Sequence, residues 1–467
     1  MCTIAGAVAR KPKKNLISLV VKMLGILQSR GHESTGVAYT NGVRMWAEKG
    51  MGEVSGFFTR FLLRKIEIDS PKAIIGHNRY STEGGSSLLN AHPFWLHISS
   101  GKVALAINGN TPNLAAKKQL MEKNGSIFES GSDTEYILKY IFEASNRRLH
   151  RLLDGIKYFM RHINATYSAS LLIRDKLFLF RDPFSNRPIH YGWIGQDTLV
   201  YASENCALEK IGAKRIKELE PGTILEVDME CNLILHRVFS KKHCNQRCQQ
   251  CVFELIYFGR PDSKIFGVQV ALFRKAIGRM LFEECRVHPE VIDGVPDSGV
   301  EGAIGYAHAS GIKQDRLILR DAKIPRTFIT PGQKNRSLAA RIKYTIVKAV
   351  VRLYSLIMVV DDSLVRSTTM KELIKMIRKA GRKILRIIVG IVSPKIKFPC
   401  YYGIDMPTKG ELIAASKSVD QIREEIDADE LYYLSLDGLK QVLIDFGADP
   451  KNFCFACFDG NYKIPLN

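Results

Sequence analysis

The sequence is poor in cysteine, has no uninterrupted apolar run of membrane length, and carries fewer acidic than basic residues. Ten cysteines in 467 residues are too sparse for a disulfide scaffold. The apolar stretch at residues 16–27 is interrupted by Lys22, and its spacing predicts an amphipathic helix with Asn15 as the cap. We therefore expect no signal peptide and no membrane span, and we place the protein in the cytoplasm.

The charge balance is strongly basic, with 68 Lys and Arg against 47 Asp and Glu and a formal net charge of +21. Such a balance suits nucleic acid, an anionic membrane surface or small polyanionic substrates. The local excess at residues 371–397 lacks the interleaved aromatic rings of a single-strand stacking platform. We therefore favour a basic enzyme over a nucleic-acid-binding protein.

The two halves of the chain differ in the pattern of their apolar runs and turns. Up to about residue 235, short apolar runs alternate with Gly and Asn turns, which indicates an antiparallel α+β domain. The polar segment 237–250 is the candidate linker. Beyond it, strands alternate with helices, which predicts a parallel sheet that binds ligands at the carboxyl ends of its strands. The predicted strands are 291–295, 355–360 and 386–392, and the predicted helices are 300–309 and 368–380.

A candidate nucleophile stands at Cys2, directly after the initiator Met. If that Met is trimmed, the α-amine of the cysteine, which titrates near pH 8, can act as its base. Asn108 and Gly109 are candidates for an oxyanion hole, Arg79 for binding a substrate carboxylate and Asp133 for binding an ammonium group. Taken singly, these residues also suit a surface ion pair, a turn or a helix cap. In order, they resemble the glutaminase domain of the N-terminal-nucleophile amidotransferases, which implies an αββα sandwich.

A second motif lies at residues 359–369, after a predicted strand and at the start of a predicted helix. The adjacent acids Asp361 and Asp362 can hold ribose hydroxyls or a divalent cation. The loop amides, with the hydroxyls of Thr368 and Thr369, can cradle a phosphate at the helix N-terminus. An ordinary strand-to-helix turn is the plain alternative. The whole string resembles the phosphoribosyl-pyrophosphate (PRPP) loop of type I phosphoribosyltransferases.

That resemblance assigns further residues. Asp297 and Ser298 resemble the loop on the pyrophosphate side, and Ser298 joins the two acids as a Mg²⁺ ligand. Arg326, with Gln333 and Arg336 beyond it, resembles the loop that closes over the substrate. The implied PRPP-binding residues are Asp297, Ser298, Arg326, Asp361, Asp362, Ser363, Arg366, Ser367, Thr368 and Thr369.

Together the two motifs resemble the amidophosphoribosyltransferase family of the iron–sulfur type. The family reaction converts glutamine, PRPP and water into 5-phosphoribosylamine, glutamate and pyrophosphate, as the first step of de novo purine biosynthesis. The resemblance implies a glutaminase domain at 2–236, a linker at 237–250 and a phosphoribosyltransferase domain with a parallel sheet and a cluster-binding tail at 251–467. It also implies a homotetramer that purine nucleotides inhibit.

Four cysteines, Cys251, Cys400, Cys454 and Cys457, coincide with the ligands of a structural [4Fe–4S] cluster in that family. Zinc could use the same thiolates, and unliganded cysteines are a further alternative. The spacing of Cys244, Cys248 and Cys251 also matches radical S-adenosylmethionine enzymes. We interpret Cys244 and Cys248 as linker residues, because those enzymes have no phosphoribosyl loop.

The sequence departs from the family pattern at several positions. Thr3 and Ser367 each replace a Gly, and at Ser367 a positive φ is expected. Ile107 replaces a His, and residues 321–325 replace the start of the closing loop. An alternative function is therefore an impaired homologue that binds nucleotides as a regulator. Asparagine and glucosamine-phosphate synthases are disfavoured, because neither needs the phosphate loop.

Overall fold

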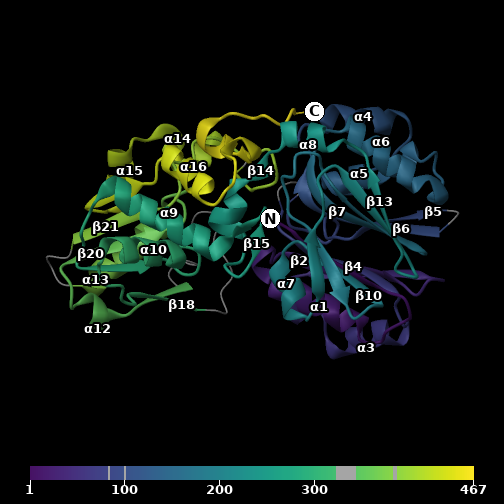
Figure 1. Cartoon of the computed structure of the whole chain (residues 1–467), viewed down its shortest axis with the longest axis horizontal. Coiled ribbons are helices and arrows are strands. Elements are labelled where there is room, and N and C mark those ends of the chain that lie inside the picture. The colour runs from purple at the N-terminus through teal and green to yellow at the C-terminus, as the bar shows by residue number, and fades with distance from the viewer. Residues whose placement is uncertain (82–84, 99–100, 322–342, 382–385, 407, 467) are drawn as a thin grey trace. The chain divides into compact units, whose positions relative to one another are not determined.

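A computed structural model describes residues 1–81, 85–98, 101–321, 343–381, 386–406 and 408–466. The chain forms two compact units (Figure 1). The first unit comprises residues 1–251, 401–405 and 462–467, and the second comprises residues 252–400 and 406–461.

The first unit is built on two antiparallel sheets. The first sheet has the strand order β11 (Lys214–Glu218), β9 (His190–Ile194), β10 (Thr198–Ala202), β1 (Thr3–Ala9), β4 (Ala73–Arg79), β2 (Ser34–Thr40) and β3 (Met45–Met51). The second has the order β13 (Leu233–Arg237), β12 (Thr223–Asp228), β8 (Lys176–Arg181), β7 (Thr166–Ile173), β6 (Gly101–Asn110) and β5 (Phe94–Ile98).

Three apolar layers hold these sheets and their helices together. Buried side chains such as Ile4, Ala104 and Leu179 fill the space between the sheets. The outer face of the first sheet packs on α1 (Leu16–Ile26), α3 (Arg60–Ile68) and α7 (Asn205–Lys210). The outer face of the second packs on α5 (Asp133–Ala144) and α6 (Leu152–His162). This arrangement confirms the predicted αββα sandwich.

Local predictions in this unit differ from the structure mainly at element ends. Helix α1 covers the predicted stretch 16–27, but the side chain of Asn15 makes no capping hydrogen bond. The predicted linker 237–250 contains the end of β13, helix α8 (Lys241–Arg247) and the start of β14 (Gln250–Cys251). It belongs to the first unit.

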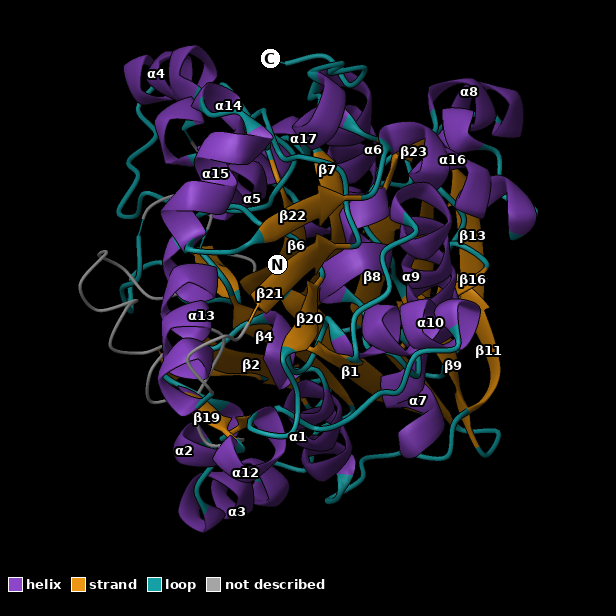
Figure 2. Ribbon diagram, turned by 90° about the vertical axis from the view of Figure 1, so that its left-hand side faces the viewer, coloured by secondary structure: helices purple, strands orange, loops and turns teal. Residues whose placement is uncertain are grey.

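The second unit contains a parallel sheet with the strand order β17 (Val291–Gly294), β20 (Leu356–Asp361), β21 (Arg386–Ile391) and β22 (Glu430–Tyr433). Because side chains alternate across a strand, Val359 and Val389 face one side while Val360 and Gly390 face the other. One face packs on α13 (Thr368–Ala380) and α15 (Val419–Ile426). The other packs on α9 (Val270–Cys285) and α10 (Val300–Ser310) (Figure 2). The predicted parallel sheet is therefore confirmed.

A glycine ends each of two helices in this unit, with different backbone conformations. Gly311 ends α10 with φ +70°, the left-handed conformation expected of a C-terminal glycine. Gly381 ends α13 with an extended backbone. Among the described residues, no helix is long and apolar enough to span a bilayer.

Candidate functional site

The candidate nucleophile is positioned by the pairing of a central strand. Strand β1 lies between β10 and β4, and Thr3 pairs with Asn78 near the end of β4. This register brings the Cys2 sulfur to 3.5 Å from both the backbone nitrogen and the carbonyl oxygen of Tyr80. The thiol therefore lies beside Arg79, the last residue of β4.

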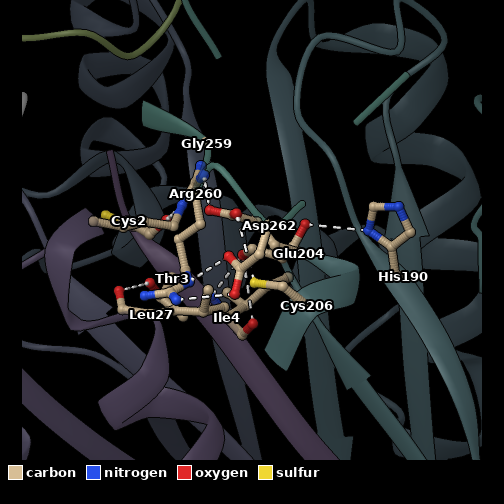
Figure 3. A network of polar contacts seen from close by, with 12 residues as sticks. Cys2, Thr3, Ile4, Leu27, His190, Glu204, Cys206, Gly259, Arg260 and Asp262 are labelled. Carbon is tan, nitrogen blue, oxygen red and sulfur yellow. Dashed lines mark hydrogen bonds and ion pairs between the residues drawn. The ribbon is translucent and has the colours of Figure 1, made fainter. Parts of the chain in front are cut away.

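A buried ion pair fixes the backbone of Cys2. Arg30 donates from Nε to the Cys2 carbonyl at 3.1 Å and lies 2.7 Å from a carboxylate oxygen of Glu204, with both side chains fully buried. The Thr3 hydroxyl donates to the Leu27 carbonyl at 3.1 Å, so the residue that replaces the family's Gly is accommodated by a hydrogen bond (Figure 3). Removing one partner of a buried ion pair is strongly destabilising, so Arg30 and Glu204 depend on each other.

A small cavity of about 20 Å³ opens beside the thiol. Its lining residues are Cys2, Arg79, Tyr80, His92, Ile107, Gly109, Ser132, Asp133 and Thr134. Four of the five residues predicted for the glutamine site therefore share one cavity. The fifth, Asn108, adjoins Gly109 and is 1% exposed, and its amide nitrogen and oxygen have no hydrogen-bond partner among the described residues. An unpartnered buried amide is costly unless a ligand completes it.

The two charged residues of the cavity are already oriented. Arg79 is 4% exposed and donates to a carboxylate oxygen of Glu33 at 3.3 Å and to the Gly85 carbonyl at 2.7 Å. Asp133 begins α5 and accepts from the backbone N–H of Thr111 at 3.0 Å. Burial raises the pKa of Asp133, against the lowering effect of that N–H.

Burial also raises the pKa of the Cys2 thiol, against the lowering effects of the nearby α-amino group, the Tyr80 backbone and Arg79. A thiol of this kind is protonated at neutral pH and needs a base before it can attack an amide. The α-amine of Cys2 can serve only after Met1 is removed. Met1 itself is 1% exposed.

Two neighbouring histidines, His77 and the cavity-lining His92, were not predicted as site residues. The rings of His77 and His92 lie 4.2 Å apart, and Nε2 of His77 lies 2.9 Å from the Ile107 carbonyl. Burial lowers the pKa of His77 to about 3, so its imidazole is neutral and donates to that carbonyl. The peptide before Asn108 is therefore fixed although Ile107 replaces the family's His. The sequence segment 76–82, which includes His77, is the feature from which this histidine could have been predicted.

We expect His77→Gln to flatten the loss of stability on acidification. Between pH 6.5 and about 3 the unfolded chain binds a proton that folded His77 refuses, so the folded state loses about 1.4 kcal/mol per pH unit as the pH falls. Urea unfolding at about pH 7 and about pH 5.5 measures this difference. The glutamine amide can still donate to Ile107, which makes it a matched replacement. An equal pH dependence in both proteins would contradict the assignment.

The second candidate site lies at the carboxyl ends of two adjacent parallel strands. Asp293 of β17 pairs with Val359 of β20, so the loops that follow these strands share one sheet edge. A cavity of about 110 Å³ opens there. Its lining residues are Phe253, Tyr257, Val295, Pro296, Asp297, Ser298, Arg320, Lys343, Tyr344, Asp361, Asp362, Ser363, Leu364, Val365, Arg366, Thr368, Thr369 and Met370.

The acidic part of this cavity is compact. The Ser298 hydroxyl donates to Asp362, and the Ser363 hydroxyl donates to the other carboxylate oxygen of Asp362 at 2.5 Å. Burial, together with the charge of Asp362, raises the pKa of Asp361 well above its usual value. Two adjacent carboxylates of this kind favour a cation, and their oxygens are hard ligands that suit Mg²⁺.

Two of the three basic residues that line the cavity lie in or next to a pair of antiparallel strands that sequence reasoning missed. Strands β18 (Ile318–Arg320) and β19 (Tyr344–Ile346) pair with Arg320 opposite Tyr344. Arg320 forms an ion pair with Asp297, and Lys343 is 6% exposed at the cavity. No recognisable motif surrounds these residues in the sequence.

Predicted residues at the start of α13 have local partners. Ser367 has φ −68°, so the positive φ expected there is wrong, and its hydroxyl bonds to Glu425. Arg366 pairs with Glu411. Arg326, Gln333, Arg336 and residues 322–325 lie outside the described residues.

The cysteines form no disulfide. Cys251 belongs to the first unit, whereas Cys400, Cys454 and Cys457 belong to the second. The part of the chain that the structure describes contains no group of three His, Cys, Asp or Glu side chains that could hold a metal. Burial raises the pKa of both Cys244 and Cys248 to about 11, which disfavours the thiolates that a cluster at that motif would need.

Comparison with known sequences places this architecture among characterised proteins. A family described as "Glutamine amidotransferase domain" matches residues 65–235. The amidophosphoribosyltransferase of Bacillus subtilis (strain 168) is 39% identical over 442 residues, which cover 94% of this chain and 90% of that protein. The amidophosphoribosyltransferase of Methanocaldococcus jannaschii is 35% identical over 480 residues, which cover 100% of this chain and 98% of that protein.

Solved structures agree over the whole chain. One, described as the allosteric regulatory enzyme of purine biosynthesis, superposes with a TM-score of 0.87 at 36% identity and covers 100% of this chain and 97% of its own. Another, the glutamine PRPP amidotransferase of B. subtilis complexed with ADP and GMP, gives the same TM-score and identity and covers 100% and 98%.

Proposed function

This chain belongs to the amidophosphoribosyltransferase family, and we propose the residues through which it catalyses the first step of purine biosynthesis. Glutamine, PRPP and water are converted into 5-phosphoribosylamine, glutamate and pyrophosphate. The observation that carries the proposal is the gathering of most of the predicted residues around two cavities, one beside Cys2 and one beside Asp361.

At the first cavity, the Cys2 sulfur attacks the side-chain amide of glutamine while the α-amine takes the thiol proton. The amide N–H of Asn108 and the backbone N–H of Gly109 stabilise the oxyanion, which matches the unpartnered state of the Asn108 amide. Arg79 binds the substrate carboxylate and Asp133 its ammonium group. Ammonia leaves with the proton, and water then hydrolyses the thioester to release glutamate.

At the second cavity, ammonia attacks C1 of the ribose and pyrophosphate leaves. The loop amides and the hydroxyls of Thr368 and Thr369 hold the 5-phosphate, and Asp361 and Asp362 orient the ribose hydroxyls. Asp361, Asp362 and Ser298 would hold Mg²⁺, which would supply positive charge to neutralise the departing pyrophosphate. The remaining PRPP contacts are assigned to Asp297, Ser363, Arg366 and Ser367, and by resemblance to Arg326.

The finer organisation also follows the family. We assign glutaminase chemistry to residues 2–236 and transfer to residues 251–467, with 237–250 as the connection. We propose a cytoplasmic homotetramer inhibited by purine nucleotides. The B. subtilis relative complexed with ADP and GMP supports the regulation.

The test of the function is an assay with two nitrogen donors. Purified protein is expected to form phosphoribosylamine from PRPP with either glutamine or ammonia, and to release glutamate when PRPP is present. Nucleotide binding without turnover of either donor would instead support an impaired regulatory homologue.

We also propose a structural [4Fe–4S] cluster on Cys251, Cys400, Cys454 and Cys457. The thiol chemistry of the four donors fits such a cluster, whereas the described residues form no group of three ligands. The support is therefore the resemblance in cysteine positions. Zinc on the same residues is the alternative.

Protein purified without oxygen is expected to contain about four iron and four sulfide ions per chain. Cys454→Ser with Cys457→Ser should lose them, because half of the thiolates are gone. Cys285→Ser is the matched control, since Cys285 is a half-exposed cysteine outside the set. Stoichiometric zinc, or iron retained in the double variant, would contradict the proposal.

A further inference from the structure

The first unit contains a second, much larger cavity of about 1010 Å³. Its walls are the turn before β3, the start of β6, the loop between α5 and α6, and the turn between β7 and β8. A volume of this size accommodates a nucleotide-sized ligand.

This cavity is remote from the nucleophile. Lys102 lies at one end of β6 and Gly109 at the other, and the seven residue steps between them span about 24 Å of extended strand. The cavity therefore has no part in the glutaminase chemistry proposed for Cys2.

The charge of the cavity wall is strongly one-sided. Six basic side chains face two acidic ones: Arg44, Lys102, Arg147, Arg148, Arg174 and Lys176 against Asp175 and Glu226. Glu226 is already held by Lys176 at 2.5 Å and by His236 at 2.8 Å, so it offsets little of the remaining charge.

Three arginines are available to a ligand. Arg44, Arg148 and Arg174 are exposed, and none forms an ion pair with any residue that the structure describes. They come from three different segments: the turn before β3, the loop after α5 and the turn between β7 and β8. Guanidinium groups converging from separate segments suit the several oxygens of a phosphate chain.

The wall also has an apolar part. Met45, Ile173 and Phe178 are buried there, and Trp46 stacks on Tyr39 at a centroid distance of 5.3 Å. This combination of apolar surface and convergent arginines differs from an ordinary solvated basic face. It is typical of sites in which apolar side chains contact the organic part of a ligand and basic side chains bind its phosphates.

We propose that this cavity binds a small anion with two or more phosphate groups, of the nucleoside polyphosphate or inorganic polyphosphate class. A long nucleic acid is a less suitable ligand, because the aromatic side chains of the lining are Trp46 and the buried Phe178, not a series of exposed rings on which successive bases could stack. Binding depends on charge and therefore weakens as salt is added.

The test compares the full-length protein with two charge-reversal variants. Arg148→Glu with Arg174→Glu reverses charge at the cavity. Arg60→Glu with Arg64→Glu makes the same change on the exposed face of α3, and neither residue lines this cavity or the one beside Cys2. Equilibrium dialysis counts the sites for ATP and, separately, for inorganic triphosphate. Glutaminase activity reports whether each variant is folded.

We expect the cavity variant to lose one phosphate-ligand site per chain, with affinity lowered roughly tenfold or more, while the control keeps it. Sites in the second unit persist in both. A site for ATP but not triphosphate identifies a nucleoside polyphosphate, and equal sites for both identify recognition of the phosphate chain alone. Arg174→Ala, an exposed turn substitution, gives a milder loss if the double variant misfolds.

The proposal is overturned if the number and affinity of sites are equal in the wild type and the cavity variant. It is also overturned if single-stranded RNA binds more tightly than either probe and is released by the same substitutions.

Discussion

Cys2→Ala is expected to lower glutamine-dependent formation of phosphoribosylamine by roughly 10⁴-fold or more, as removal of a covalent nucleophile does. The sulfur lies at the mouth of the cavity that also contains Arg79, Gly109 and Asp133, and no second thiol lines that cavity. Synthesis with ammonia as donor should be unaffected, because it needs only the second site. The measurement is the rate of phosphoribosylamine formation with each donor at saturating PRPP.

Cys285→Ala controls for the loss of a thiol as such, since Cys285 is also half-exposed but lies in α9. It should leave both rates unchanged. Glutamine-dependent turnover that survives Cys2→Ala would refute the assigned nucleophile. Loss of the ammonia-dependent rate in the same variant would show that the change had damaged more than the thiol.

Asp361→Asn and Asp362→Asn should each lower synthesis with either donor by roughly 10²-fold or more, because a neutral amide cannot replace a carboxylate toward a cation or a ribose hydroxyl. The volume of the side chain is kept, so the packing of Val359 and Val360 beneath it is preserved. Glutaminase activity measured without PRPP should remain. The readout is kcat and KM for PRPP over a range of Mg²⁺ concentrations.

Asp420→Asn is the matched control, because the side chain of Asp420 is 88% exposed at the start of α15. It removes the same charge without touching the cavity. Wild-type rates in Asp361→Asn and Asp362→Asn would contradict the role of the pair, and a parallel loss of basal glutaminase activity would point to unfolding.

The sequence predicted those parts of the fold and of the sites whose signal lies within a short stretch of neighbouring residues. Short apolar runs that alternate with glycine turns indicated strands such as β6 and β7. The sequence motifs indicated Cys2, Asp361 and Asp362, because neighbouring residues carry that signal. The contact between Arg30 and Glu204 joins residues 174 positions apart and depends on the pairing of β1 with β10. A register of that kind cannot be read from either segment alone.

Dependence on contacts between distant segments also explains the other features that were not predicted. His92 was not predicted because only the fold brings its ring to 4.2 Å from that of His77 and places it at the cavity. Lys343 lies outside the closing-loop motif and reaches its cavity through the pairing of β18 with β19. At Ser367 the family comparison suggested a positive φ, but the helix start tolerates an ordinary helical backbone.

The central position of β1 has a consequence for the order of events during synthesis. Its neighbour β10 and the carboxylate of Glu204 emerge only after about 200 residues have been made, which takes about 10 to 40 seconds at roughly 5–20 residues per second. In the folded chain Met1 is 1% exposed. We therefore expect Met1 to be removed faster from the nascent chain than from the folded protein. A chain that folds with Met1 in place lacks the free α-amine of Cys2 that the proposed mechanism uses as its base.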